Sequence, residues 1–147
     1  YKFLLYLIYK AKVMNILKLG GLDCRLFELV APLVMNPAVL RQNNNYPFKT
    51  TRKYVWYVAE DGGRVLGFMP VKMAETNYRV DNYYISGDDS SVMERLLDGV
   101  IRDFSFGLPL VAIVHERHVE GFSRKNFISC VEWKRYVKMR YHEGGKS

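Results

Sequence analysis

The chain has few cysteines and lacks a long uninterrupted apolar segment. Its two cysteines, Cys24 and Cys130, cannot form the multi-disulfide framework that holds many small secreted domains together. Free thiols with apolar neighbours, such as these two, usually behave as small buried hydrophobic groups. We therefore expect a reducing compartment, the cytoplasm. The apolar stretch over residues 1–9 is much shorter than the ~20 residues that span a bilayer, so no membrane segment is predicted.

Several motifs that mark enzymes and metal sites are also missing. The sequence contains no Walker loop, dinucleotide-binding fingerprint or nucleophile elbow. His115 and His118 stand three positions apart, whereas a helical pair of zinc ligands stands four apart, and no third ligand is evident. We therefore expect no metal site.

Acidic residues are fewer than basic ones, with 15 Asp and Glu against 22 Lys and Arg and a net charge of +7 at pH 7. Part of this excess lies in residues 1–13, which contain lysines and no acidic residue, and Met14 resembles a natural start. We expect residues 1–13 to be an upstream or non-native extension, or alternatively an extra element packed on the core. Residues 14–142 then form the domain and residues 143–147 a flexible tail. The remaining basic excess would attract a phosphate-rich partner.

The length and composition predict one globular domain with a sizeable core. The chain has 147 residues, of which 49% are hydrophobic and 25% charged, as is ordinary for a globular protein. Hydrophobic periodicity and turn residues then divide the domain into elements. We predict strands over residues 16–19, 54–59, 64–73, 78–86, 110–114, 127–131 and 136–141. Helices are predicted after Asp23 and within 115–125, with a short turn over 37–41. A long helix is predicted to start in the capping loop 87–91 and to stop at 107–109.

Local signals fix some of the boundaries. Asp23 suits a helix N-cap, and Asn126 suits the left-handed residue that ends a helix. Pro70 cannot donate a ladder hydrogen bond, so a bulge or an edge is expected in its strand. One parallel crossover runs from Ile85 through the long helix to Leu110. The predicted fold class is therefore α+β in three layers, with a mixed, mostly antiparallel sheet and one splayed parallel pair.

The order of the last elements resembles that of the acyl-CoA N-acyltransferase family, the GNAT superfamily. The resemblance begins at the strand Tyr83–Ser86 and runs through the long helix and the buried strand Leu110–Val114. It continues through a short helix that ends at Asn126-Phe127 and two closing strands, and it extends over nearly all of residues 14–141. The resemblance implies an N-acyltransferase, most simply an N-acetyltransferase, that transfers an acyl group from acetyl-CoA to a primary amine. The acceptor would be a small molecule, a peptide or a modified base, and the protein a monomer or homodimer.

The resemblance also places the cofactor. In that family pantetheine lies between the two splayed strands, and the pyrophosphate lies at the N-terminus of the long helix, where free N–H groups and the helix dipole favour phosphate. The matching residues here are Tyr84, Ile85, Ser86, Gly87, Ser90, Ser91, Val92 and Phe122. The family usually has an Arg or Gln and two glycines in this loop, whereas this chain has one glycine and two aspartates. Helix capping by Asp88, Asp89 or Ser90 explains the same residues without a ligand. Any compensating positive charge would come from Arg79, Arg95 or Arg102.

Candidate catalytic residues follow from the needs of amine acylation, which are a neutral amine and a stabilised thiolate. His115 ends the buried strand and titrates near neutrality, and Glu75 lies near the end of the third meander strand. Tyr83 or Tyr84 would supply a hydroxyl acid. Phe122 stands where the family often has the tyrosine that is thought to protonate the thiolate, so it is either a core ring or a wall for pantetheine.

Two other interpretations stay open. The aspartate-rich loop and Phe122 are also consistent with a catalytically inactive relative that binds a protein or a nucleic acid. The basic and aromatic residues over 134–141 fit solvated strand faces or a nucleic-acid platform. The polar loop over residues 42–53 is expected to help form the acceptor pocket.

Overall fold

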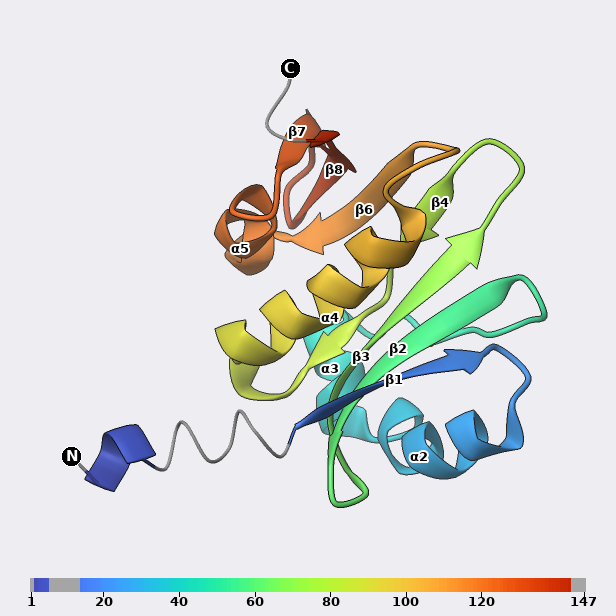
Figure 1. The fold of residues 1–147 in the computed structure, drawn as a ribbon, viewed down its shortest axis with the longest axis vertical. Helices are drawn as coiled ribbons and strands as arrows, with labels where there is room; N and C mark the ends of the chain where they lie inside the picture. The colour runs from blue at the N-terminus through green and yellow to red at the C-terminus, as the bar shows by residue number, and fades with distance from the viewer. Residues whose placement is uncertain (1, 6–13, 144–147) are drawn as a thin grey trace.

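Over residues 2–5 and 14–143, which are the residues that the structure describes, the backbone forms an eight-stranded mixed sheet with helices on both faces (Figure 1). The structure is a computed structural model. The strand order is β1-β2-β3-β4-β6-β8-β7, and β5 pairs with β3 beside this path. In chain order the elements are β1 (Asn15–Gly20), α2 (Cys24–Val34), α3 (Pro37–Gln42), β2 (Tyr54–Asp61), β3 (Arg64–Met73), β4 (Tyr78–Val80), β5 (Tyr84–Ile85), η1 (Ser86–Asp88), α4 (Ser90–Phe104), β6 (Leu110–His115), η2 (Glu116–His118), α5 (Val119–Ser123), β7 (Phe127–Glu132) and β8 (Tyr136–Tyr141).

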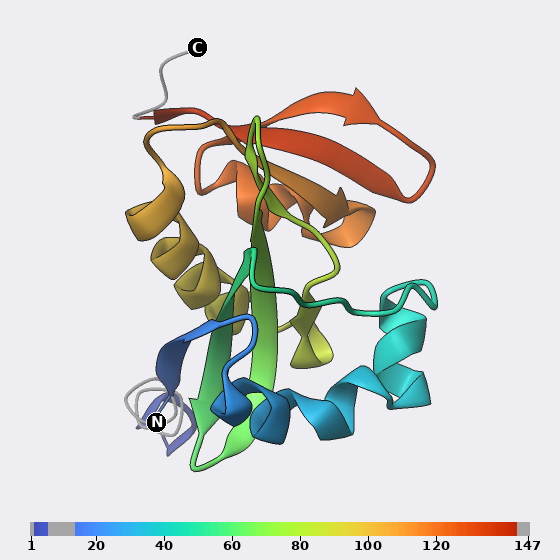
Figure 2. The same ribbon diagram turned by 90° about the vertical axis from the view of Figure 1, so that its right-hand side faces the viewer.

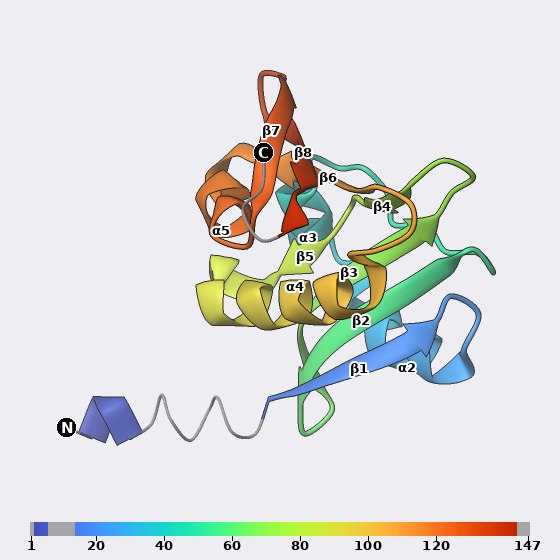
Figure 3. The same cartoon turned by 45° about the horizontal axis from the view of Figure 1, so that its top comes forward.

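The predicted fold class is confirmed. The pair β4 and β6 is parallel, and the other strand pairs of the described residues are antiparallel. Figure 2 shows the three layers, with α4 on one side of the sheet and α2 and α3 on the other. α5 lies beside the N-terminal half of α4 (Figures 1 and 3). Each face of the sheet therefore has its own apolar core.

The core on the α4 side follows the predicted helical pattern. Val92, Leu96, Leu97, Val100 and Phe104 are all buried in α4. They pack with residues of β2, β3, β4 and β6 in one cluster. The second cluster lies under α2 and α3 and draws its strand residues from β1, β2, β3 and β5. β4, β6 and β8 consequently lie beyond the area that α2 and α3 cover.

The strand predicted over residues 78–86 is wrong in one respect, because it is two short strands. Asn82 has a φ of 50°, a left-handed conformation that a continuous strand does not contain. β4 therefore ends at Val80, and β5 begins at Tyr84. β4 pairs with both β3 and β6, whereas β5 pairs with β3. The parallel partner of β6 is consequently β4, and the segment around Ile85 is separated from β6.

Several local predictions can be compared directly with the structure. Asp23 caps α2, since its carboxylate accepts a hydrogen bond of 2.8 Å from the amide of Arg25. Asn126 has a φ of 70°, as predicted for a residue that ends a helix. Pro70 pairs with Trp56 and falls between the β3 residues that pair with β5 and those that pair with β4, so it occupies a local edge. The bulge lies instead between Ala59 and Glu60.

The expectation that both cysteines are buried is wrong. Cys24 and Cys130 are free and exposed. Cys24 is the first residue of α2, and Cys130 lies at a register shift in β7, the outermost strand. An apolar sequence neighbourhood did not reveal that these positions face outward.

The predictions about the chain ends concern residues that are mostly outside the described ones. Of residues 1–13, only 2–5 are described, and they are helical. Of residues 143–147, only Glu143 is described. Within the described residues, no helix is both long enough and apolar enough to cross a membrane.

The close approach of β3 to β5 depends on Gly67. A Cβ atom at this position would lie 2.7 Å from the carbonyl oxygen of Tyr84 and 3.2 Å from Cγ1 of Val92. We predict that Gly67→Ala lowers the free energy of unfolding by about 1–3 kcal/mol, because backbone atoms of β5 must move. Gly20→Ala is the control, since a Cβ atom there meets nothing within 4 Å, and it should stay within about 0.5 kcal/mol of the wild type. Urea unfolding measures both, and equal stability of the two variants would contradict the packing described.

Candidate functional site

The candidate site lies where β5 separates from β6. β4 and β6 run parallel and stay paired up to Val80 and Ala112. Beyond this point β5 pairs with β3, while Ile113–His115 pair with β8. The amide of His115 donates a hydrogen bond of 3.1 Å to the hydroxyl of Tyr83. The hydroxyl of Tyr83 thus accepts the hydrogen bond that a neighbouring strand would otherwise accept from β6 at this point.

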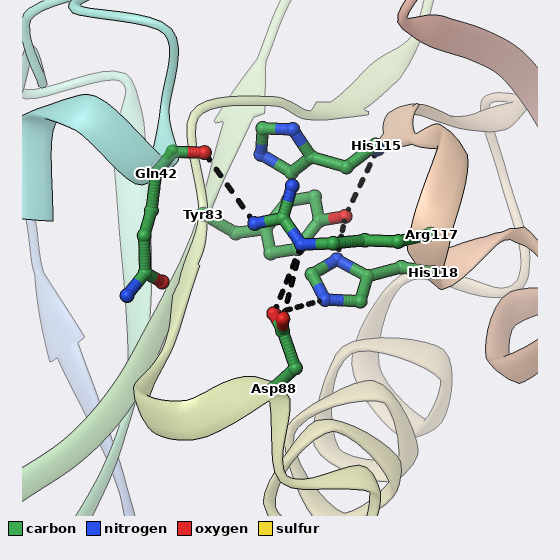
Figure 4. Close-up of polar contacts among 6 residues, drawn as sticks. All are labelled: Gln42, Tyr83, Asp88, His115, Arg117 and His118. Carbon is green, nitrogen blue, oxygen red and sulfur yellow. Dashed lines mark hydrogen bonds and ion pairs between the residues drawn. The ribbon is translucent and has the colours of Figure 1, made fainter.

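Tyr83 begins a chain of hydrogen bonds that links β5 to η2 and η1 (Figure 4). Its hydroxyl lies 2.7 Å from Nδ1 of His118, and Nε2 of His118 lies 2.7 Å from Oδ1 of Asp88. The ionised carboxylate of Asp88 can only accept, so Nε2 of His118 carries the proton and donates it to Asp88. In a neutral imidazole Nδ1 is then the acceptor, and the Tyr83 hydroxyl donates to it while it accepts from the amide of His115. This pattern satisfies every donor and acceptor with a neutral imidazole.

Arg117 completes the network. Its Nε lies 3.1 and 3.2 Å from the two carboxylate oxygens of Asp88, and its Nη2 donates to the carbonyl oxygen of Gln42 at 3.4 Å (Figure 4). Burial opposes the charge on Asp88, but the hydrogen bonds from Arg117 and His118 outweigh it and hold its pKa below the ordinary value. Asp88 is therefore an anion at neutral pH, and it ties η1 to η2.

The N-terminus of α4 is capped by a second aspartate. The carboxylate of Asp89 accepts hydrogen bonds from the amides of Ser91 at 2.9 Å and Val92 at 3.4 Å. It also accepts from the hydroxyl of Ser91 at 2.7 Å. This is the capping that the sequence predicted as an alternative to phosphate binding. A phosphate at this helix end would have to compete with Asp89 for the same amides.

The predicted cofactor residues lie in order from the gap to the helix. Tyr84 and Ile85 are buried in β5, and Ser86 and Gly87 form η1. Ser90, Ser91 and Val92 form the first turn of α4. These residues therefore lie along one path from β5 through η1 to the start of α4, and Phe122 lies apart from them in α5.

Phe122 is a fully buried ring. Its centroid lies 5.7 Å from that of Tyr83 and 5.3 Å from that of Phe127. In the structure Phe122 is therefore a core ring, which was one of the two roles predicted for it. Tyr83 and Phe122 together fill the space between β5, β6 and α5, and a ligand in the gap would therefore have to displace Tyr83.

The two predicted catalytic residues lie apart. His115 is 3% exposed, and its ring packs 5.1 Å from Tyr83 and 5.0 Å from Tyr136. Burial, helped by the positive charge of Arg117, lowers the pKa of His115 from its ordinary value of 6.5 to about 4. Glu75 lies in the exposed turn before β4, whereas the gap opens after β4. The structure does not bring Glu75 to His115.

The structure adds a functional candidate, Asp81, that the sequence analysis did not select. A cavity of about 350 Å³ opens at the end of β4 and is lined by Tyr46, Asp81, Asn82, Ile113, Trp133 and Tyr136. Burial raises the pKa of Asp81 above its ordinary value, although Arg79, Lys72 and Lys49 act in the opposite direction. Nε of Arg79 lies 3.2 Å from Oδ2 of Asp81. The available signal was the polar pair Asp81-Asn82, which interrupts a strand pattern over 78–86.

The loop after α3 also contributes to the cavity that contains Asp81. The side chain of Asn44 donates a hydrogen bond to the hydroxyl of Tyr136, which fixes the loop against β8. Tyr46 follows two residues later and reaches the cavity. The loop over residues 42–53 thus supplies one wall of the cavity that contains Asp81. Among residues 2–5 and 14–143, no group of three or more His, Cys, Asp or Glu side chains is arranged to hold a metal ion.

Known structures share this fold. The chain is similar to ElaA from Escherichia coli, with a TM-score of 0.66 and 12% identity over 87% of this chain and 99% of the other. It is similar to an acyl-CoA N-acyltransferase from Pseudomonas aeruginosa, with a TM-score of 0.63 and 15% identity over 88% and 99%. It is also similar to the PaiA N-acetyltransferase from Thermoplasma acidophilum in complex with coenzyme A, with a TM-score of 0.56 and 15% identity over 87% and 98%. No family model and no curated protein sequence matches the chain.

These likenesses show that the chain has the acyl-CoA N-acyltransferase (GNAT) fold. The resemblance predicted from the order of the elements is confirmed at the level of the fold.

The buried histidines make stability depend on pH. Between pH 6.5 and about 4 the unfolded chain binds a proton at His115 that the folded protein does not bind. We predict that the free energy of unfolding is maximal above pH 6.5 and falls as the pH decreases, by at most about 1.4 kcal/mol per pH unit for this group. Burial also lowers the pKa of His118, which adds to the same trend.

Urea unfolding at a series of pH values tests this prediction. His115→Gln should flatten the profile over this range, because it removes one titrating group and leaves His118. His142→Gln is the control, since His142 follows β8 near the end of the described residues, and its profile should match that of the wild type. An unchanged slope in His115→Gln would contradict the assignment of a buried, neutral His115.

Proposed function

We propose that the chain is an acyl-CoA-dependent N-acyltransferase, most simply an acetyltransferase that acts on a primary amine. The observation that carries this proposal is the separation of β5 from β6 directly beside a cavity that contains a partly buried carboxylate. The gap offers strand edges to an extended acyl donor, and the cavity offers a place for the acceptor amine. The Thermoplasma acetyltransferase with the same fold is a complex with coenzyme A, which supports acetyl-CoA as the donor.

Asp81 is the proton acceptor in this proposal. An amine attacks a thioester only in its neutral form, so the ammonium group must lose a proton before or during attack. A carboxylate whose pKa is raised by burial accepts that proton more readily than an exposed one. As the new C–N bond forms and the C–S bond breaks, the proton passes to Asp81 and the thiolate leaves. Rings of Tyr46, Trp133 and Tyr136 line the cavity and favour the cationic form of the amine during binding.

The donor occupies the gap and the start of α4. Tyr84, Ile85, Ser86 and Gly87 line the path toward the helix, and Ser90, Ser91 and Val92 supply its first turn. Tyr83 must turn away to admit the donor, which frees the amide of His115 to pair with it. His115 is neutral in this role and acts through its amide and through the position of the Tyr136 ring. We place the reaction in the cytoplasm, where exposed thiols such as Cys24 and Cys130 stay reduced.

A second candidate function is a catalytically inactive module that binds a macromolecule. The observation that favours it is the occupied start of α4, where Asp89 accepts from the helix amides and Asp88 is held by Arg117 and His118. In this case the network is permanent and Tyr83 stays in the gap. The two candidates differ in whether acetyl-CoA binds and is consumed.

Release of the CoA thiol from acetyl-CoA, measured with a panel of primary amines, tests the proposed reaction. We predict amine-dependent release by the wild type and a loss of about 10²–10⁴-fold in kcat/KM for Asp81→Asn, since a general base contributes this much. Activity should fall as the pH drops through the raised pKa of Asp81. Acetyl-CoA affinity, measured by calorimetry, should not change in this variant.

Glu75→Gln is the matched control. It also removes one carboxylate, but from an exposed turn, and should leave kcat/KM within a few-fold of the wild type. Full activity of Asp81→Asn would exclude Asp81 as the base. Failure of acetyl-CoA to bind would exclude the enzyme and favour the inactive module.

A further inference from the structure

The part of the sheet beyond α2 and α3 carries a row of cations. Residues that face each other across neighbouring strands point to the same face of a sheet. The register aligns one such row across β3, β4, β6 and β8: Lys72, Arg79, Val111 and Arg140. Lys138 lies opposite Ile113 in β6, and Ile113 lines the cavity that contains Asp81. The cationic row therefore runs beside the proposed acceptor cavity.

The positive charge continues into the loop between α3 and β2. Lys49, Arg52 and Lys53 line, together with Lys72, a second cavity of about 780 Å³ that has no acidic residue in its walls. Lys72 lies opposite Arg79, and Arg79 pairs with Asp81, so this second cavity lies near the one that contains Asp81. We call the following set the basic face: Lys49, Arg52, Lys53, Lys72, Arg79, Lys138 and Arg140.

Most cations of the basic face have no acidic partner. Among the described residues, Arg79 pairs with Asp81, and the other members form no ion pair. Some cations elsewhere do pair, as Lys18 does with Asp103, Arg124 with Glu120 and Lys125 with Asp98. Unpaired charges of one sign next to each other create a local potential that attracts a polyanion.

Two exposed rings stand at the edge of the same region. The side chains of Tyr46 and Trp133 are 60% and 52% exposed, and both line the acceptor cavity. They also line a neighbouring cavity of about 360 Å³ with Lys134 and Arg135. Figure 2 shows the loop after α3 and the β7–β8 hairpin, which carry these rings, on the same side of the molecule. Aromatic rings beside unpaired cations are the combination that binds bases and phosphates of single strands.

We propose that the basic face, with Tyr46 and Trp133, binds a single-stranded nucleic acid, and that the acceptor amine is carried by this nucleic acid. The second part rests on the proposed function. The cations contact phosphates along the row, and the rings stack on unpaired bases at the mouth of the cavity. An acidic peptide would use the cations but would gain nothing from the rings.

Fluorescence anisotropy of a fluorescein-labelled uridine decamer, titrated with the protein in the absence of acetyl-CoA, tests the binding. We expect saturable binding that weakens with salt, with a log–log slope of about −2 or steeper if three or more phosphates are contacted. Trp133→Ala should weaken binding at least about fivefold through lost stacking. Phe106→Ala removes another exposed ring, which lies in the loop after α4 and lines none of these cavities, and this variant should bind as the wild type does.

Charge reversal tests the cations separately. Arg140→Glu should weaken binding and flatten the salt dependence, whereas Arg64→Glu, at the exposed first residue of β3, should leave both unchanged. Thermal unfolding of each variant verifies that it is folded. The proposal is overturned if the decamer does not bind at low salt, if Trp133→Ala binds as tightly as the wild type, or if polyglutamate of equal charge competes as well as unlabelled decamer.

The two proposals fail independently. Decamer binding without amine-dependent release of CoA would support the nucleic-acid-binding surface and exclude the proposed enzymatic activity. CoA release without decamer binding would support the proposed enzymatic activity and exclude a nucleic acid as its acceptor.

Discussion

The break in the backbone between Val80 and Tyr84 is the constraint on which the rest of the site depends. With Asn82 in a left-handed conformation, β4 ends early and β5 is directed to β3. β6 then has a parallel partner only up to Ala112 in the described residues. The same break places Asp81 at a cavity on one side of the sheet and the Tyr83 hydroxyl against β6 on the other. A continuous strand over 78–86 would have closed the gap with ladder hydrogen bonds.

Two aspartates, Asp81 inside this break and Asp88 after it, have opposite environments. Burial raises the pKa of Asp81, while Arg117 and His118 outweigh burial at Asp88 and lower its pKa. Carboxyl groups whose pKa values are moved apart take different roles. Asp88 is suited to hold η1 against η2 as a permanent anion, and Asp81 is suited to exchange a proton with a bound amine. The cations near Asp81 lie mostly on the basic face, so the same charges that favour a polyanion also limit the rise of the pKa of Asp81.

The sequence was sufficient for features that depend on neighbours along the chain. The apolar face of α4, the caps at Asp23 and Asn126 and the order of the strands all follow from local periodicity and turn chemistry, and the structure confirms them. It was insufficient where distant segments meet. Asp81 matters because Tyr46 and Trp133 enclose it, and neither is near it in sequence. The bond between His118 and Asp88 joins residues 30 positions apart. The exposure of Cys24 and Cys130 depends on which element covers them, which apolar neighbours in sequence do not reveal.

The proposed function requires that an acyl donor enter the gap between β5 and β6. Amide hydrogen exchange, followed residue by residue with and without saturating acetyl-CoA, detects this entry. We expect slower exchange over 84–86 and 113–115 and at the start of α4, with α2 unchanged, because strand edges and helix amides gain partners there. Unchanged exchange over both strand segments at saturating acetyl-CoA would contradict it.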